Sequence, residues 1–186
     1  MSDTSSTDEE FAVVLDFLAH GNSGGRFGGS PVAYAASIDD FTLYELELEA
    51  DADISILDHV RIRPDFEAGI ARGHVVDYED LSDGARSELD YVVEDIVDED
   101  EQRFVDFYND AQPISLRLHQ LNLLPGIGDK LRDNILDERK RHGPFESFDD
   151  LEDRVSGLHN PREVIIDRIL EEIQEDDLKY QNFVGS

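Results

Sequence analysis

The strongest constraint on the fold is a short glycine-containing connection between two segments that have helical periodicity. The upstream segment, 113–121, begins at a proline and places apolar side chains at i, i+4 and i+7. The downstream segment, 131–142, repeats apolar residues at i, i+4 and i+5 and is followed by Gly143-Pro144, a typical helix stop. Because the connection is so short, the sequence predicts a tight hairpin of two helices.

The connection itself has the composition of an anion site. Its sequence is Leu123-Leu124-Pro125-Gly126-Ile127-Gly128-Asp129-Lys130. The glycines on either side of Ile127 let the backbone turn and leave its N–H groups uncovered, where the second helix begins and its dipole favours negative charge. Lys130 adds a mobile positive charge one turn into the helix. We therefore predict that phosphate binds at this connection.

The residues Leu124-Pro125-Gly126-Ile127-Gly128-x-Lys130, followed by Ile135 and Arg139, resemble the helix-hairpin-helix motif of DNA- and RNA-binding proteins. In that family the hairpin amides and the basic residue hold the sugar-phosphate backbone without reading bases, and the resemblance places this role on Gly126, Gly128 and Lys130. The chain departs from the pattern at Arg132, where the family usually has a small residue, so Arg132 must point outward or widen the helix packing. A hairpin that only packs and binds no ligand is the alternative.

The charge around the hairpin is opposite in sign to that of the whole chain. The chain has 45 acids and 16 bases and a net charge of −29, whereas residues 117–141 contain six bases and four acids. Arg139, Lys140 and Arg141 lie near the end of the second helix, where the dipole alone also favours cations. Positive charge at a phosphate motif predicts a nucleic-acid contact. The predicted contact residues are Gly126, Ile127, Gly128, Lys130, Arg132, Arg139, Lys140 and Arg141.

The excess of acids is spread along segments that keep apolar periodicity, so it indicates a folded protein with an acidic surface rather than a disordered tail. This composition is similar to that of proteins from salt-in halophiles, whose cytosol holds molar salt with a Debye length of about 3 Å. An acidic surface opposes nucleic-acid binding in dilute buffer but much less at such salt. Amide hydrogen bonds at a preformed hairpin should then matter more than scattered charges.

The amino-terminal half predicts a small β-barrel. An acidic leader, 1–10, is expected to be disordered, and five strand patterns come after it. The strand patterns span 11–18, 32–37, 41–50, 58–63 and 69–76. Five short strands with one long early loop indicate an OB- or S1-like barrel over 11–80, although a generic five-stranded barrel fits the same pattern. The loop carries Arg26 and Phe27, which we predict to offer a charge and a stacking ring to a single strand; a loop without a ligand is the alternative.

The carboxyl-terminal half predicts only helices. A helical connector over 81–112 is expected to begin with a helix capped by Ser82. Beyond it, the sequence predicts a tandem helix-hairpin-helix domain over 113–175 and a polar tail over 176–186. The expected fold class is therefore α+β multidomain, a five-stranded OB-like β-barrel and then an all-α helix-hairpin-helix region.

The tandem arrangement depends on a second, degenerate hairpin. Residues 155–161, Val-Ser-Gly-Leu-His-Asn-Pro, repeat the order of the first hairpin but have His159 in place of its second glycine. Ser147 should cap the helix before this hairpin, and Asn160 should cap the helix after it. We expect the first hairpin to bind and the second to pack.

Further resemblance covers nearly the whole chain from Phe11. The similar stretches are 78–81 (Tyr-Glu-Asp-Leu), 85–89 (Ala-Arg-Ser-Glu-Leu), 103–109, 117–121 (Arg-Leu-His-Gln-Leu) and 144–148 (Pro-Phe-Glu-Ser-Phe). They resemble an archaeal family of uncharacterised proteins described as nucleotide- or RNA-binding. The resemblance implies an amino-terminal β-barrel with carboxyl-terminal helix-hairpin-helix helices, here in a halophilic member.

Several other kinds of site are not predicted. Cysteine is absent, the six histidines show no ligand spacing, and we expect no metal site and no cofactor, apart from a monovalent cation that hairpin carbonyls could hold. No apolar run approaches 18 residues and the first ten residues are polar, so we expect a cytoplasmic protein without a membrane partner. An enzyme is not predicted; a magnesium-dependent nuclease using Asp39 and Asp40, or Asp149 and Asp150, is the minor alternative.

The function predicted from the sequence is non-enzymatic binding of nucleic acid, RNA rather than DNA, through backbone phosphate and without sequence specificity. A protein-interaction scaffold whose hairpins only pack, and a DNA-binding accessory in repair or replication, are the alternatives. Oligomeric state stays open.

Overall fold

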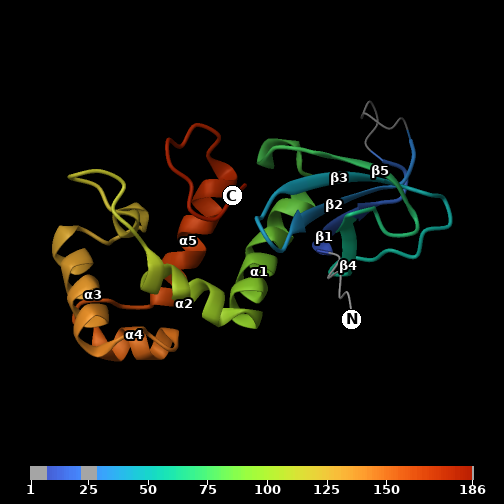
Figure 1. The fold of residues 1–186 in the computed structure, drawn as a ribbon. Helices are drawn as coiled ribbons and strands as arrows, with labels where there is room; N and C mark the ends of the chain where they lie inside the picture. Colours follow the sequence, from blue (N-terminus) through green and yellow to red (C-terminus); the bar gives the residue numbers. More distant parts are fainter. Residues whose placement is uncertain (1–7, 22–28, 186) are drawn as a thin grey trace, which may run out of the picture. The chain divides into compact units, whose positions relative to one another are not determined.

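The structure is a computed structural model that describes residues 8–21 and 29–185. The described residues form two compact units, one up to residue 92 that also includes 183–185, and one of residues 93–182. The first unit is built on β-strands and the second on helices, so the protein is of the α+β class (Figure 1).

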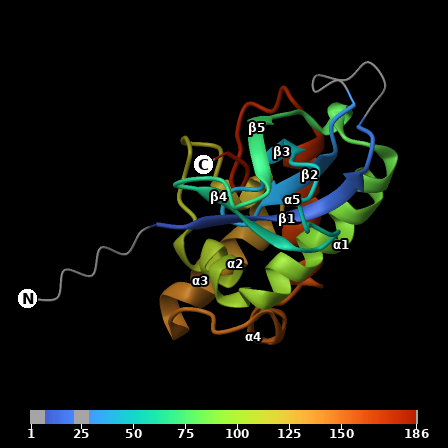
Figure 2. The ribbon, with the colours of Figure 1, turned by 90° about the vertical axis from the view of Figure 1, so that its right-hand side faces the viewer.

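The first unit contains a five-stranded antiparallel sheet with the order β4-β1-β2-β3-β5. Its strands are β1 (Glu10–Leu18), β2 (Val32–Ser37), β3 (Leu43–Leu48), β4 (His59–Arg63) and β5 (Ile70–Val75). The five predicted strands are confirmed. The sheet curls strongly (Figure 2), but β4 and β5 are its two edges, and within the described residues they do not pair with each other. It is therefore a curled half-barrel, a coarser form of the barrel that the sequence predicted.

The core of this unit follows the alternation of the strands. One cluster contains Ala12 and Val14 from β1, Ala33 and Ala35 from β2, and Leu46 from β3, each with no exposed area. The opposite face of β2 is buried as well, so both faces of this strand are covered. Helix α1 (Asp83–Glu99) starts beside the sheet, where the Ser82 hydroxyl donates to the Asp16 carboxylate at 2.6 Å and accepts from the Ala85 amide at 3.1 Å. The predicted Ser82 cap is confirmed.

The second unit contains the end of α1 and then α2 (Glu101–Asp110), α3 (Asp129–His142), α4 (Phe148–Arg154) and α5 (Pro161–Gln174). Helix α5 contributes much of the core through Ile165, Ile166 and Ile169, which are at most 2% exposed. The Ser147 hydroxyl accepts from the Asp150 amide at 2.9 Å, as predicted for the cap of α4.

The predicted helix over 113–121 is wrong. Pro113 and His119 form an isolated antiparallel bridge, and only a short 3₁₀ helix, η2 (Gln120–Leu123), precedes the glycine connection. A nine-residue helix is marginal by itself, and here the imidazole of His119 accepts the Leu121 amide at 3.1 Å, which stabilises the tighter turn instead.

The segment after α5 is held by a buried ion pair. Arg168 donates to Glu172 at 2.8 Å, and these side chains are 6% and 0% exposed. Arg168 also lies 3.4 Å from the Glu171 carboxylate. Both members of the buried pair bind backbone as well, because Arg168 donates to the Tyr180 carbonyl at 2.7 Å and Glu172 accepts from the Asn182 amide at 2.7 Å. The expected polar tail is therefore anchored over these residues.

Candidate functional site

The first hairpin, defined as residues 124–129, makes a tight turn whose glycines have different roles. Gly126 has a φ of 81°, a conformation that side chains other than glycine rarely adopt. The Ile127 amide closes the turn by donating to the Leu124 carbonyl at 3.2 Å, and the Ile127 side chain is only 4% exposed. Gly128 is the N-cap of α3, with an ordinary φ of −86°, and its carbonyl accepts the Arg132 amide at 2.9 Å. The turn requires glycine at the first position but not at the second.

The backbone of this hairpin is open to a ligand. A Cβ atom added at Gly126 or at Gly128 would meet no atom within 4 Å. In the part of the chain that the structure describes, the amides of Gly128, Asp129 and Lys130 donate to no protein acceptor. They lie at the start of a 14-residue helix, whose dipole favours an anion there.

The Lys130 side chain is exposed and forms no ion pair or hydrogen bond among the described residues. Arg132 behaves differently, because its guanidinium is 3.1 Å from carboxylate oxygens of both Asp129 and Asp133 and donates to the Asn122 side chain at 3.1 Å. It therefore neutralises the acid nearest the open amides and ties the hairpin to η2. The charge of Arg132 is therefore already engaged.

The three bases at the end of α3 also divide into two kinds. Arg139 donates to the Tyr108 carbonyl at 2.9 Å and to the Ala111 carbonyl at 3.0 Å, so it satisfies acceptors at the end of α2. Lys140 and Arg141 are exposed and have no ion-pair partner in the described part of the chain. Of the predicted bases, Lys130, Lys140 and Arg141 are thus available to a ligand.

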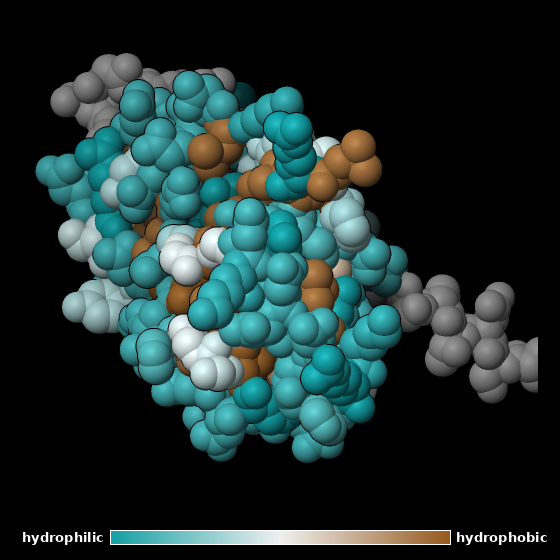
Figure 3. Space-filling model, turned by 90° about the vertical axis from the view of Figure 1, so that its left-hand side faces the viewer, coloured by the Kyte–Doolittle hydropathy of each residue, from teal (hydrophilic) through white to brown (hydrophobic). Residues whose placement is uncertain are grey.

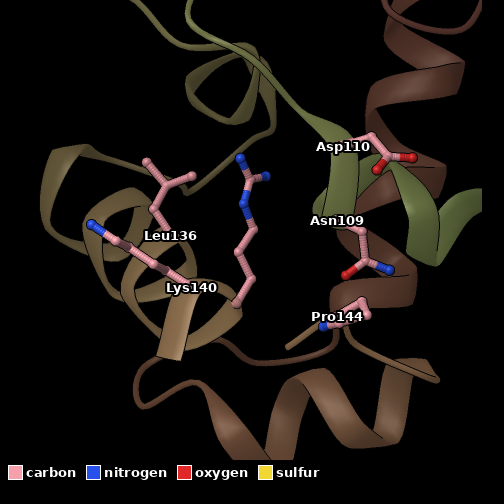
Figure 4. Close-up of a pocket in the computed structure, with 6 residues that line it drawn as sticks. Asn109, Asp110, Leu136, Lys140 and Pro144 are labelled. Carbon is pink, nitrogen blue, oxygen red and sulfur yellow. The ribbon is translucent and has the colours of Figure 1, made fainter. Parts of the chain in front are cut away.

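A cavity of about 490 Å³ lies between α2 and α3 beside these bases (Figure 4). Arg139, Lys140 and Leu136 line it on the α3 side, and Asn109 and Asp110 line it on the α2 side. Asn109 joins one wall of the cavity to the segment after α3, because its side-chain NH₂ donates to the Phe145 carbonyl at 3.0 Å and its side-chain oxygen accepts the Phe145 amide at 2.7 Å. Lys140 lines the cavity without an ion-pair partner among the described residues.

The second hairpin, defined as residues 155–160, repeats the backbone turn of the first. Gly157 has a φ of 90°, the Leu158 amide donates to the Val155 carbonyl at 3.3 Å, and Leu158 is 2% exposed. The Ser156 carbonyl accepts from Asn134 of α3 at 3.4 Å, so this turn packs against the first hairpin's helix.

The second hairpin differs from the first where its helix begins. The Asn160 amide donates to the Glu152 carboxylate at 3.2 Å, and Pro161 at the first helical position has no N–H. Asn160 stands at the N-cap with φ 49° and its side chain makes no capping hydrogen bond, so the predicted side-chain cap is wrong. An anion would meet a carboxylate and no free amide at these two residues.

Two further residues, Asn122 at the first hairpin and Arg154 at the far end of α3, were not singled out from the sequence. The Asn122 amide donates to the Ile127 carbonyl at 3.4 Å, and its side-chain oxygen accepts the His119 amide at 3.1 Å. Arg154 donates to the Gly143 carbonyl at 2.8 Å and to Glu138 at 3.1 Å, and the hydrogen bond from Arg154 lowers the pKa of Glu138. The spacing of His119 and Asn122 in a capping box was a usable signal, whereas the contacts of Arg154 are not local.

Other predicted sites add little. Arg26 and Phe27 lie outside the described residues. Within residues 8–21 and 29–185, no three acidic or histidine side chains come together as a metal would require, and no helix has the length and apolar content of a membrane span. On the face shown in Figure 3, hydrophobic atoms form small, separate patches in a hydrophilic surface.

The fold and this site define an α+β protein with a curled antiparallel sheet and a helical unit that carries two glycine turns. The chain belongs to the family described as "Protein of unknown function (DUF655)", whose model matches residues 8–185. It is 36% identical over 178 residues to the uncharacterised protein MJ0038 of Methanocaldococcus jannaschii, covering 95% of this chain and 80% of that protein. It is also similar to the crystal structure of Af1531 from Archaeoglobus fulgidus, with 38% identity, a TM-score of 0.79 and coverage of 95% of this chain and 100% of the other.

Proposed function

We propose that the protein is a non-enzymatic nucleic-acid-binding protein that holds backbone phosphate at the first hairpin, with RNA as its preferred ligand. The observation that carries this proposal is the contrast between two similar turns. The first leaves the amides of Gly128, Asp129 and Lys130 without a protein acceptor among the described residues. At the N-cap and first helical positions of the second, the Asn160 amide donates to the Glu152 carboxylate and Pro161 has no N–H. Open amides at a helix start, next to an unpaired lysine, are the groups that phosphate binding requires.

In this proposal the hairpins are a tandem helix-hairpin-helix region in which η2 replaces the first helix. Gly126 and Gly128 permit close approach of the phosphate, Ile127 fixes the turn in the core, and Lys130 supplies charge. Lys140 and Arg141 extend the contact along α3, while Arg132 and Arg139 hold the site in place.

The preference for RNA rests on the first unit. A curled five-stranded sheet with an early glycine-rich loop is consistent with an OB-like surface, which binds single strands through charge and stacking. Arg26 and Phe27 are the residues that we propose for that contact. No cofactor is required, and a monovalent cation at the hairpin carbonyls would be compatible with the proposal.

The acidic composition sets the conditions for binding. With a net charge of −29, the protein should repel nucleic acid at low salt and bind it in the molar potassium of a halophile cytoplasm, which we propose as its location. Hydrogen bonds from fixed amides survive such salt better than isolated charge contacts do.

The test is a matched pair of substitutions, Gly128→Asp and His159→Asp, which add a carboxylate at the corresponding position of each hairpin. Gly128 has the backbone conformation of an N-cap and open space around it, so aspartate should fold there and cap α3 through its own side chain. We expect Gly128→Asp to weaken binding of a single-stranded RNA by about 100-fold, since its carboxylate occupies and repels the phosphate position. His159→Asp should change the affinity less than twofold.

Fluorescence anisotropy in molar potassium chloride measures both variants against single-stranded RNA, single-stranded DNA and duplex DNA. Lys130→Glu combined with Gly128→Asp should abolish binding. If this double variant binds all three ligands as the wild type does, or if the wild type binds none of them, the proposal fails and a protein-interaction scaffold becomes the better account.

A further inference from the structure

A short loop projects from the second unit just before the first hairpin. This tip loop, defined as residues 113–119, is closed by the bridge between Pro113 and His119. The Leu118 carbonyl accepts both the Ile114 amide at 2.8 Å and the Ser115 amide at 3.0 Å. Below the bridge, the Gln120 amide donates to the Gln112 carbonyl at 3.0 Å. The tip loop therefore has a hydrogen-bonded base and a defined conformation.

Leu116 stands at the end of this loop and is fully exposed, at 106% of its reference area. Among the described residues of the second unit, it is the one large hydrophobic side chain that is exposed. The side chains of Ile114 and Leu118 on either side are partly buried, so the loop makes its apolar contacts at the base and leaves its tip apolar residue in solvent. A single, fully exposed leucine on a loop held by backbone hydrogen bonds is placed to insert into a ligand as a wedge rather than to pack against the protein.

The charge of the surrounding sequence indicates which kind of ligand Leu116 contacts. No acid occurs from Ala111 to Gly128, although acids make up 45 of the 186 residues. This acid-free segment contains the tip loop, exposed Arg117, η2 and the first hairpin. Only η2, four residues long, separates the loop from the hairpin, a rise of about 8 Å. Figure 1 shows the loop and the start of α3 at the same end of the second unit. A polyanion held at the hairpin therefore passes close to Leu116.

We propose that Leu116 inserts between bases of the nucleic acid whose backbone the first hairpin holds, and that the protein consequently selects strands with unpaired or bulged bases over an intact duplex. This inference rests on the proposed function and deepens it, because it assigns a structural class of ligand. Apolar side chains that enter a base step gain contact with the base faces, and the energy needed to open the step is least where a base is already unpaired. Arg117 beside the tip would approach the neighbouring phosphate.

The test compares Leu116→Ala with Val75→Ala, which removes another well-exposed apolar side chain, 62% exposed, from strand β5. Leu116→Phe serves as a rescue variant that keeps an apolar tip. Each protein is titrated in molar potassium chloride against a single strand, a perfect duplex and a duplex with one bulged nucleotide, in RNA and in DNA. A 2-aminopurine placed next to the bulge reports unstacking through its fluorescence.

We expect Leu116→Ala to bind the single strand and the bulged duplex about five- to tenfold more weakly and the perfect duplex less than twofold more weakly. The wild type and Leu116→Phe should raise the 2-aminopurine signal, while Leu116→Ala should not. Because Leu116 makes no buried contact, the thermal midpoint should stay unchanged in this variant.

The inference is overturned if Leu116→Ala keeps the wild-type affinities and fluorescence change while Gly128→Asp still loses binding. That result would still support phosphate binding at the first hairpin and would show that the tip loop faces away from the nucleic acid. Absence of binding by the wild type would instead overturn the proposed function, and this inference with it.

Discussion

The two hairpins of the second unit share one backbone turn but differ in the residues that lead from this turn into the next helix. Gly126 and Gly157 have φ values of 81° and 90°, and each precedes a buried aliphatic residue whose amide closes the turn. The first helix then begins directly after Gly128, whereas the second begins one residue later, with Pro161 at its first position. The turn itself is therefore a structural element, and we propose that the next two or three residues decide whether it binds an anion.

The two hairpins differ in their free hydrogen-bond donors as well as in the charges around them. At the second hairpin the Asn160 amide is satisfied by Glu152, and Ser156 accepts a side chain of α3. At the first hairpin Arg132 engages the carboxylates of Asp129 and Asp133, and Lys130 has no partner among the described residues. In our proposal the same fold carries one turn that packs and one that binds a ligand, and substitutions at either turn can test that division.

The largest effect should come from placing alanine at the two positive-φ glycines. Gly126→Ala and Gly157→Ala should each destabilise the protein by about 1–2 kcal/mol, because a left-handed conformation is costly for a residue with a Cβ. Chemical denaturation measures this loss. RNA affinity at a temperature where both variants are folded should fall about tenfold for Gly126→Ala alone. Equal losses of affinity in both variants would show that the two turns are not functionally distinct.

The salt dependence of binding should reveal few phosphate contacts and identify one of them. Lys130→Gln should reduce the slope of log K against log[KCl] by about 0.7 to 0.9, the value of a single phosphate contact. Lys179→Gln, at an exposed lysine near the second hairpin's helix, should leave the slope unchanged and serves as the control. A slope that does not respond to Lys130 would remove this residue from the contact.

The segment that leads into the first hairpin should also be sensitive to acid. Burial, and then the charges of Arg139 and Arg132, lower the pKa of His119. The unfolded chain takes up this proton near its ordinary pKa of about 6.5, so the stabilisation is complete above that pH and is lost as pH falls through 6.5 toward the lower folded pKa. Protonation would remove the acceptor for the Leu121 amide.

Thermal midpoints between pH 5 and pH 7.5 test this expectation. His119→Asn keeps a capping acceptor but cannot titrate, so it should flatten the pH dependence in this window. A wild-type midpoint that is equally flat would contradict the prediction.

The smallest effect should come from removing the unfavourable backbone conformation of Asn160 in the second hairpin. Asn160 has a φ of 49°, which asparagine tolerates better than most residues but glycine adopts at less cost. Asn160→Gly should therefore be stabilising by about 0.5 kcal/mol and leave binding unchanged, as measured by denaturation and anisotropy. A gain in RNA affinity would mean that the second hairpin takes part in binding.

Sequence reasoning located the regular elements and missed contacts that depend on tertiary structure. The strands and helices α1 to α5 follow apolar periodicity, which burial enforces. The helix predicted over 113–121 failed because its three apolar residues do not line one buried face, and because the His119 side chain favours a 3₁₀ turn.

The candidate site could be predicted only in part for the same reason. The glycines and Lys130 are close in the sequence, and their pattern predicts the role that we propose for them. Arg139, by contrast, donates to carbonyls 28 and 31 residues earlier in the chain, and no spacing in the sequence distinguishes such an arginine from one that faces a ligand. From the sequence alone, the amides of the second hairpin are equally available to a ligand. Only the structure shows that the Asn160 amide donates to Glu152.

The most direct test of the central claim is to follow the backbone amides of both hairpins by NMR while a short single-stranded RNA is added in molar potassium chloride. We predict that the amide protons of Gly128, Asp129 and Lys130 move downfield with a common saturation curve, as donors do when they bind phosphate, while those of Gly157 and Asn160 do not move. Equal shifts at the two hairpins, or saturable binding without any shift at the first, would contradict the account.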